Sequence, residues 1–271
     1  MKVATVQTSG GSRVVRVEDD GSFRALALAG VDMRDVLAGR AIDVAETVDA
    51  DAVLAPLRPG KIVAIGLNYL DHVRESGMDL PGEPLIFTKF TSSVIGTGEP
   101  IIFDPSFATR VDWEVELAVV IGRTARDVAA DDALSYVFGY TVANDVSARD
   151  LQLGDGQWVR GKSLDTFCPL GPWITTADEV IDPQALSLTT RVDGELVQDS
   201  STGEMIFSVA EIIAFCSRAF TLEVGDVILT GTPWGCGEFA TPRRSLKDGE
   251  VVEVEVSGLG VLSNQVIAPG R

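Results

Sequence analysis

Histidine is almost absent from this chain of 271 residues, in which His72 is the only one. A zinc site built from several histidines is therefore excluded, and a bound metal would have to rely on carboxylates. Oxygen ligands favour a hard cation such as Mg²⁺, Mn²⁺ or Ca²⁺. Any acid–base step that uses a histidine must use His72.

Cysteine and basic residues are also scarce. Cys168, Cys216 and Cys236 are odd in number, lie far apart and form no Cys-x-x-Cys pair. This spacing argues against a disulfide framework or a zinc knuckle and predicts a protein of the reducing cytoplasm. The 22 basic residues stand against 40 acidic ones, a net charge of −18 that makes nucleic acids and anionic membrane surfaces poor partners.

Long apolar runs are missing as well. No stretch approaches the roughly 20 residues that a membrane-spanning helix needs, and the N-terminus lacks the apolar core of a signal peptide. The motif Gly-x-Ser-x-Gly is also absent, which argues against a serine hydrolase. The composition, 45% hydrophobic and 23% charged, is that of an ordinary globular protein.

Strand patterns outnumber helix patterns along the chain. Alternating residues at Lys2–Gln7 and Ser12–Val17 predict a small β-rich N-terminal domain over residues 1–58. The turn-forming stretch Pro56–Gly60 separates it from a larger domain over residues 59–271. Because strands and helices do not alternate, we expect an α+β, β-rich fold with a mixed, largely antiparallel sheet or a barrel-like β-roll.

The helix patterns are fewer. Residues 37–51 are acidic and alanine-rich and predict a helix followed by a connection. Asn68 is expected to cap a helix over Tyr69–Glu75 that Gly77 ends. The clearest amphipathic pattern is that of Ser208–Phe220.

Two glutamates share one face of a predicted strand over Val111–Ile121. Side chains two apart on a strand point the same way, so Glu114 and Glu116 lie side by side. Their face continues with Ala118 and Val120, so the strand runs into a core. Two such carboxylates repel each other unless a cation lies between them, and a divalent metal would serve. The alternative is an exposed strand end with two solvated glutamates.

Three further segments carry candidate functional side chains. Asp145 ends a predicted strand and could supply a third ligand, or it could only form a turn. His72 and Glu75 are neighbours on a helix, as a base oriented by a carboxylate would be, although surface pairs of this kind are common. The glycine-rich stretch 231–237 lacks the lysine of a phosphate loop; it could hold a substrate carboxylate or be a plain turn.

Taken together, five motifs resemble the fumarylacetoacetate hydrolase family, in particular its bacterial acylpyruvases and 2-hydroxyhepta-2,4-diene-1,7-dioate isomerases. They are Gly66-Leu-Asn-Tyr69 with His72 and Glu75, Asp112-x-Glu114-x-Glu116, Asn144-Asp145-Val-Ser-Ala-Arg149-Asp150-x-Gln152, Gly161-Lys162-Ser163, and Thr230-Gly231-Thr232-Pro233-x-Gly235-x-Gly237. The resemblance runs in order from about Lys61 to Ile267. It implies the mixed β-roll of that family and a homodimer. Trp234 and Cys236 depart from the family pattern, which would alter the shape of the pocket.

The resemblance also implies roles for single residues. Glu114, Glu116 and Asp145 would hold Mg²⁺ or Mn²⁺. His72 and Glu75 would form a water-activating pair on a lid, and Lys162 would stabilise an oxyanion beside the metal. The implied substrate-binding residues are Lys89, Arg149, Gln152 and Thr232.

The implied activity is metal-dependent hydrolysis of a C–C bond in an acylpyruvate or another 2,4-dioxo acid, through a metal-stabilised enolate. Fumarylpyruvate, acetylpyruvate and 2,4-dioxo-3-deoxy sugar acids are candidate substrates. The same enolate serves oxaloacetate decarboxylation and isomerisation of 2-hydroxyhepta-2,4-diene-1,7-dioate, so both reactions stay open. A non-catalytic acid-binding protein would be expected to lack a metal ligand, the His72–Glu75 pair or Lys162, and none of these is missing.

Overall fold

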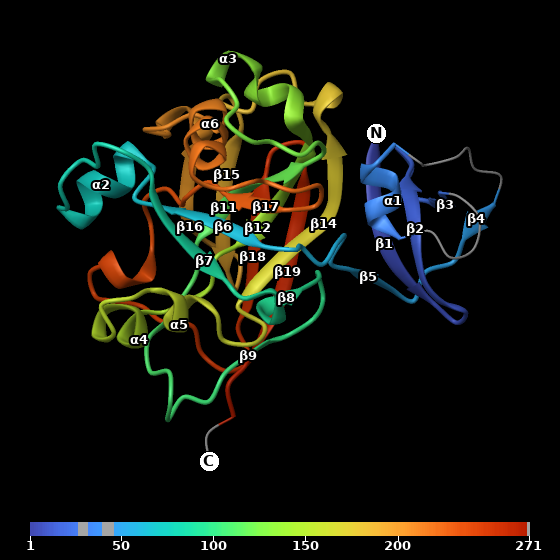
Figure 1. Ribbon diagram of the computed structural model, residues 1–271. Helices are drawn as coiled ribbons and strands as arrows, with labels where there is room; N and C mark the ends of the chain where they lie inside the picture. The colour runs from blue at the N-terminus through green and yellow to red at the C-terminus, as the bar shows by residue number, and fades with distance from the viewer. Residues whose placement is uncertain (27–31, 40–45, 270–271) are drawn as a thin grey trace.

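Two β-sheets packed face to face form the body of the protein (Figure 1). The computed structural model describes residues 1–26, 32–39 and 46–269 of the chain. Strands dominate and helices lie around the sheets, so the expected α+β, β-rich class is confirmed. Within the described residues the sheets stay open and do not close into a barrel.

The larger sheet is mixed. Its strands are β1 (Lys2–Thr8), β2 (Gly11–Val17), β3 (Phe23–Ala25), β4 (Thr47–Val48), β5 (Ala52–Leu54), β6 (Ile62–Gly66), β7 (Leu85–Lys89), β8 (Val94–Ile95), β11 (Val115–Ile121), β12 (Val137–Asn144), β14 (Cys168–Thr176) and β17 (Val227–Leu229). The order is β4-β3-β2-β1-β14-β12-β11-β17-β6-β7, with β5 beside β1 and β8 beside β14. The pairs β17–β6 and β14–β8 are parallel, and the other pairs are antiparallel.

The smaller sheet has the order β16-β15-β18-β19-β9. Its strands are β9 (Ile101–Ile102), β15 (Ser187–Val192), β16 (Glu195–Ser201), β18 (Val251–Val256) and β19 (Gly260–Ile267). The turn at Asp193 and Gly194 joins β15 and β16. The last two strands of the chain, β18 and β19, are inner strands of this sheet. A short pair, β10 (Val111–Asp112) with β13 (Ser147–Ala148), stands apart.

The alternation along β11 separates two apolar cores. Val115, Leu117, Val119 and Ile121 belong to the core between the two sheets. On the opposite face Ala118 and Val120 belong to a second core, which includes Val3 and Leu26 of the N-terminal strands. The face that carries Glu116 therefore runs into a core, as the sequence predicted.

The N-terminal strands continue the larger sheet. Lys2 of β1 lies opposite Thr175 of β14 in an antiparallel pair, and Val3 packs in the same core as Ile174. The predicted N-terminal unit is β-rich, but its strands share a sheet with the rest of the chain. The division at residue 58 stays a prediction.

The helices lie outside the sheets. They are α1 (Met33–Leu37), α2 (Leu70–Ser76), α3 (Ala130–Ala133), α4 (Arg149–Gly154), α5 (Val159–Lys162) and α6 (Val209–Ala219). The predicted amphipathic helix is confirmed as α6, which Ser208 and Glu211 cap reciprocally. Figure 1 shows α2, α4 and α5 on the side away from the N-terminal strands. No helix in the described part of the chain is both long and apolar enough to cross a membrane.

Two helix predictions need correction. The helix expected over residues 37–51 does not form in its described part, because α1 ends at Leu37 and β4 follows; residues 40–45 lie outside the described residues. Asn68 does not cap α2, since its buried amide donates to the carbonyl groups of Phe207 and Thr230. Gly77 does end α2, in the left-handed conformation with φ of 67°.

Candidate active site

The three predicted metal ligands come together where β11 begins and β12 ends. These strands are antiparallel neighbours, with Val115 opposite Asn144. Glu114 and Glu116 at the start of β11 therefore lie beside Asp145, which follows β12. One carboxylate oxygen from each of the three lies within 4.8 Å of the others, and all three side chains are buried.

Two buried lysines hold this carboxylate cluster. The Lys162 ammonium lies 2.7 Å from Glu114 Oε2 and 2.8 Å from Asp145 Oδ2. The Lys89 ammonium lies 2.5 Å from Asp145 Oδ1 and 3.2 Å from the Val146 carbonyl oxygen. Both lysines therefore lie against the predicted ligands, and the oxyanion role of Lys162 and the substrate contact of Lys89 stay predictions.

Arg149 links the cluster to Asp112. Its guanidinium lies 2.7 Å from Asp112 Oδ2 and 2.6 Å from Glu114 Oε1, and it donates to Gln152 Oε1 at 3.0 Å. Asp112 also accepts hydrogen bonds from the Gly237 and Glu238 amides. Asp112 thus fixes Arg149 against Glu114, a role that we did not predict although Asp112 stands in the motif.

The charges of the site leave one carboxylate unpaired. Burial opposes ionisation of Glu114, but Lys162 and Arg149 lower its pKa to about 2. Burial and the charges of Asp145 and Glu114 raise the pKa of Glu116 well above its usual range. Glu116 accepts a hydrogen bond from the Gly231 amide at 2.7 Å, and the described residues place no lysine or arginine at ion-pair distance from it.

A divalent cation fits this donor set. Asp112, Glu114, Glu116 and Asp145 contribute four carboxylates, against the three cations Lys89, Arg149 and Lys162. A buried carboxylate without a cationic partner is costly, and a bound cation removes that cost. Three carboxylates are the oxygen donors that Mg²⁺ or Mn²⁺ prefers. Glu114, Glu116 and Asp145 would hold the ion.

The His72–Glu75 pair lies on α2. His72 Nδ1 is 3.5 Å from Glu75 Oε1, and neither atom has a hydrogen-bond partner among the described residues. The Phe239 ring packs edge-on against the imidazole, with ring centroids 5.4 Å apart. The Gly235 amide donates to Glu75 Oε2. The pair is adjacent, as predicted, but not hydrogen-bonded in this conformation.

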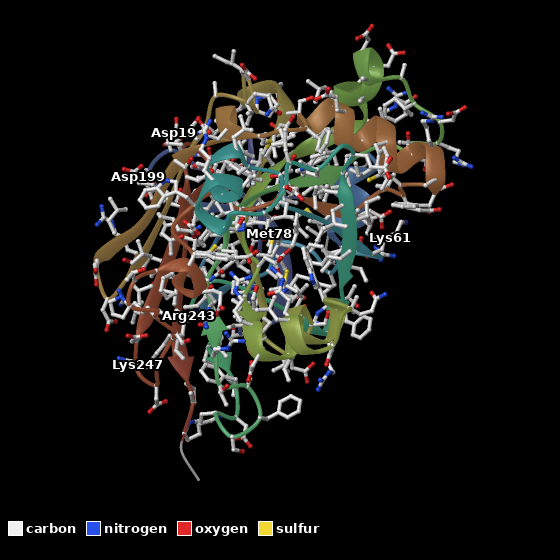
Figure 2. The ribbon with its side chains drawn as sticks, turned by 90° about the vertical axis from the view of Figure 1, so that its left-hand side faces the viewer. Asp19, Lys61, Met78, Asp199, Arg243 and Lys247 are labelled. Carbon is white, nitrogen blue, oxygen red and sulfur yellow. The ribbon has the colours of Figure 1, made fainter. Side chains whose placement is uncertain are left out.

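His72, Glu114 and Glu116 line one cavity of about 260 Å³, whereas Asp145 and Lys89 are not on its wall. Figure 2 looks onto the side of the molecule that carries Met78 and Arg243, which line the same cavity. The predicted site residues on its wall are His72, Glu114, Glu116, Arg149, Gln152, Lys162 and Thr232. Glu75 lines a separate cavity on the other side of Phe239.

Gln198 is a positioning residue that sequence reasoning missed. Its buried carboxamide accepts from the Val115 amide at 3.0 Å and donates to Thr232 Oγ1 at 3.0 Å and the Pro233 carbonyl at 3.1 Å. It therefore ties β16 to both the metal-ligand strand and the 230–237 segment. A polar residue at an inward position of a strand was the only signal, and it has meaning only once the opposing sheet is known.

Comparison with known proteins supports the family resemblance that the sequence motifs indicated. Residues 61–267 match the family described as Fumarylacetoacetate (FAA) hydrolase C-terminal. Oxaloacetate tautomerase FAHD2B, mitochondrial, of Bos taurus is 50% identical over 217 residues, which make up 79% of this chain and 69% of the relative.

Two solved structures share the whole fold. Fumarylacetoacetate hydrolase (EaFAH) from psychrophilic Exiguobacterium antarcticum has a TM-score of 0.91 and 39% identity, covering 99% of this chain and 100% of the other. The 2-hydroxyhepta-2,4-diene-1,7-dioate isomerase from Mycobacterium marinum has a TM-score of 0.84 and 35% identity, covering 100% of both chains. This chain therefore belongs to the fumarylacetoacetate hydrolase family.

Proposed function

We propose that this protein is an enzyme that interconverts the keto and enol forms of a small anionic 2-oxo acid of the oxaloacetate type. The observation that carries the proposal is that His72, Lys162, Glu114 and Glu116 line one small cavity, with Asp145 beside the two glutamates. The relatedness to a tautomerase named for oxaloacetate points to the same chemistry.

His72 is the residue that can move a proton at the substrate carbon. Its Nδ1 faces Glu75, so Nε2 remains for the substrate. Tautomerisation removes a proton from the carbon beside the 2-oxo group and returns it there in the reverse direction, and an imidazole nitrogen within reach of that carbon can accept and return the proton. No attacking water is required.

Lys162 can balance the negative charge that forms on the 2-oxo oxygen. Burial lowers the pKa of its ammonium, but Asp145 and Glu114 outweigh burial and raise it, so the group stays protonated. A fixed cation that is itself buried stabilises an enolate more than it would in water. When bound at Glu114, Glu116 and Asp145, Mg²⁺, or Mn²⁺ or Ca²⁺ in its place, would supply a Lewis acid for the 2-oxo group.

The size of the cavity favours a short substrate. Its volume of about 260 Å³ lies below the roughly 300–1,000 Å³ of typical small-molecule sites. The cavity would offer an anionic substrate the cations of Arg149 and Lys162 and the apolar rings of Phe87 and Trp158. A four-carbon diacid suits this space better than a long acyl chain.

Hydrolysis of an acylpyruvate is the second candidate. It is favoured by Glu75 beside His72, because a base oriented by a carboxylate can activate water. In this conformation His72 Nδ1 and Glu75 Oε1 are 3.5 Å apart without a hydrogen bond, so that pair would have to close first. Decarboxylation of oxaloacetate uses the same site without the attacking water.

A substrate panel with Mg²⁺ separates these reactions. We expect oxaloacetate to lose its enol absorbance faster than the uncatalysed control without release of pyruvate. Pyruvate from oxaloacetate would instead indicate decarboxylation, and pyruvate from acetylpyruvate or fumarylpyruvate would indicate hydrolysis. Failure to accelerate any of these reactions, with Mg²⁺ shown to be bound, would contradict the proposal.

We also propose a cytoplasmic homodimer, on the strength of the family resemblance and of three buried free thiols. Light scattering in solution tests the dimer: a mass near twice 28.8 kDa is expected. Cell fractionation tests the compartment, and a mitochondrial location, as in the name of the bovine relative, would contradict it.

A further inference from the structure

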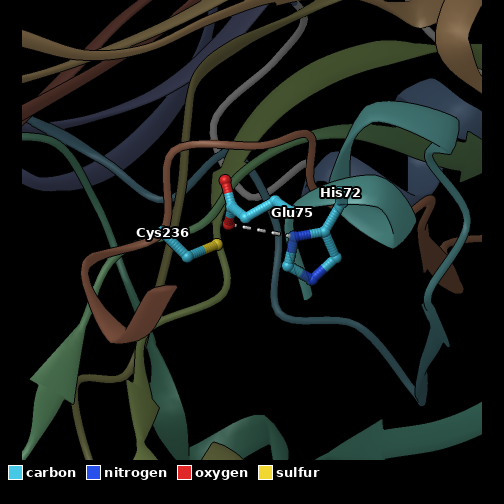
Figure 3. A group of neighbouring side chains, drawn as sticks. All are labelled: His72, Glu75 and Cys236. Carbon is cyan, nitrogen blue, oxygen red and sulfur yellow. Dashed lines mark ion pairs between the residues drawn. The ribbon is translucent and has the colours of Figure 1, made fainter. Parts of the chain in front are cut away.

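His72 and Glu75 face a third potential ligand from another part of the chain. Figure 3 shows the Cys236 sulfur directed toward the Glu75 carboxylate, with His72 on the far side of that carboxylate. One ligand atom from each of the three residues lies within 4.8 Å of the others. Two of the residues come from α2 and one from the 230–237 segment.

Two atoms of this group are buried and unsatisfied. His72 Nδ1 and Glu75 Oε1 have no hydrogen-bond partner among the described residues, and the His72 side chain is only 9% exposed. A buried polar atom without a partner calls for an explanation, and an ion that binds at the site is one such explanation. Both atoms belong to the group that includes Cys236.

We propose that His72, Glu75 and Cys236 form a second metal site, selective for a thiophilic ion such as Zn²⁺, which inhibits the enzyme when filled. Nitrogen, sulfur and carboxylate oxygen together are zinc ligands, whereas Mg²⁺ avoids sulfur. The second site is thus chemically distinct from the all-carboxylate cluster of Glu114, Glu116 and Asp145.

The geometry requires little movement. Zinc ligands at about 2.0–2.3 Å from a tetrahedral ion lie about 3.3–3.8 Å apart, so separations of up to 4.8 Å close with shifts on the order of 1 Å. The Cys236 thiol, whose pKa burial raises well above its usual range, would release its proton to solvent as the sulfur–zinc bond forms.

The surroundings supply an entry path and support for the ligands. Glu75 and Cys236 line a cavity of about 780 Å³ that is separate from the one lined by His72. Phe239 borders both cavities. The Gly235 amide holds the other oxygen of Glu75, which orients the carboxylate.

Inhibition follows from the role of His72, and this part rests on the proposed function. A metal on Nδ1 prevents His72 from cycling between its neutral and protonated forms, so the ring can no longer carry the substrate proton. Zinc would also join α2 to the 230–237 segment and restrain the helix.

Metal binding is tested directly, with no need for turnover. Protein saturated with Mg²⁺ is titrated with Co²⁺ as a spectroscopic substitute for Zn²⁺, and the thiolate-to-cobalt charge-transfer band is followed. We expect one Co²⁺ per chain with this band, and Zn²⁺ should abolish it. A wild-type protein without the band would overturn the proposal, whatever the variants do.

Matched variants locate the site. Cys236→Val has a side chain of similar volume without a ligand atom and should lose the band, whereas Cys216→Ala, on α6, should keep it. Zn²⁺ should raise the melting temperature of wild type and of Cys216→Ala but not of Cys236→Val. A band that survives in Cys236→Val would overturn the assignment, as would its loss in Cys216→Ala.

Inhibition is measured separately, relative to the uninhibited rate of each variant. With excess Mg²⁺, we expect Cys236→Val to need at least about tenfold more Zn²⁺ than wild type for half inhibition, a shift that corresponds to about 1.4 kcal/mol of binding. Zinc binding without loss of rate would overturn the inhibitory role alone. Zinc binding to a protein with no turnover would refute the proposed function and leave the metal site standing.

Discussion

Glu116 is the residue on which the metal assignment depends most directly. Among the four carboxylates of the site, Glu116 is the one for which the described residues place no lysine or arginine at ion-pair distance. Burial and the charges of Asp145 and Glu114 raise its pKa. A bound cation would oppose that rise, because it favours the ionised carboxylate. A substitution of Glu116 should therefore affect the metal affinity and the stability of the metal-free protein differently.

Glu116→Gln is expected to weaken Mg²⁺ binding by about tenfold or more, because even the loss of a residue that only supports a metal ligand typically costs about 10–100-fold. The stability of the metal-free protein should change little, since glutamine resembles the protonated acid. Calorimetric titration with Mg²⁺ and urea unfolding without metal measure the two effects. Mg²⁺ affinity equal to that of wild type would remove Glu116 from the metal site.

His72→Gln separates proton transfer from metal binding. General acid–base catalysis contributes about 10²–10⁴-fold, so the tautomerisation rate should fall within that range. Mg²⁺ affinity should stay as in wild type, because His72 is not part of the carboxylate cluster. An enol-decay assay and calorimetry measure the pair of quantities. A variant with an undiminished rate would exclude His72 as the base.

The carboxylates of the site could be predicted from sequence, but the residues that hold the site in place could not. Glu114 and Glu116 share a face because strand geometry is local, and Asp145 joins them through the pairing of neighbouring strands. Gln198 reaches the site from the opposite sheet. Its position depends on how two sheets pack, which no local pattern encodes.

Among the elements, the segment after β17 joins the two halves of the site. The Gly231 amide donates to Glu116, and the Gly235 amide donates to Glu75. Gly231 has φ of 98°, and a Cβ there would lie 2.9 Å from Asn68 Cβ. Only glycine fits without a shift of this segment.

Gly231→Ala should therefore move the amide away from Glu116. We expect weaker Mg²⁺ binding and a less stable protein, with a loss on the order of 1 kcal/mol or more from the left-handed backbone alone. The matched control is Gly82→Ala, in the loop before β7, where a Cβ meets nothing within 4 Å. Equal melting temperatures and Mg²⁺ affinities in the two variants would show that the segment tolerates a side chain.

Elements with a strong local period were predicted well. The alternating pattern of β11 can be recognised in the sequence, and so can the apolar face of α6 and its N-terminal cap. The N-terminal region was harder, because alanine-rich composition favours a helix by propensity alone. Around β4 the pairing with β3 overrides that propensity, which is weak compared with tertiary contacts.

At the scale of the whole molecule, the N-terminal strands cover an edge of the main sheet. Deleting residues 1–58 would leave the outer edge of β14 without β1 and expose apolar side chains packed against Val3 and Leu26. We expect an aggregation-prone protein with a lower melting temperature. Size-exclusion chromatography and thermal unfolding test this. A monodisperse truncated protein as stable as wild type would show that residues 59–271 form an independent domain.

Metal binding should stabilise the whole fold. A ligand that binds only the folded state adds about 2.7 kcal/mol at 100 times its Kd, so Mg²⁺ should raise the melting temperature and EDTA should lower it. Glu116→Gln is the matched control and should show a much smaller rise. A wild-type melting temperature that does not change with Mg²⁺ would contradict a carboxylate metal site.

The two halves of the site lie on different parts of the scaffold. The predicted metal ligands lie on or next to β11 and β12, in the middle of the main sheet, whereas His72 and Glu75 lie on α2, a two-turn helix at the edge of the fold. The main sheet could thus keep the proposed metal site while the base on α2 is exchanged. Redesign of α2 alone is the economical route to converting this protein from one reaction of a 2-oxo acid to another.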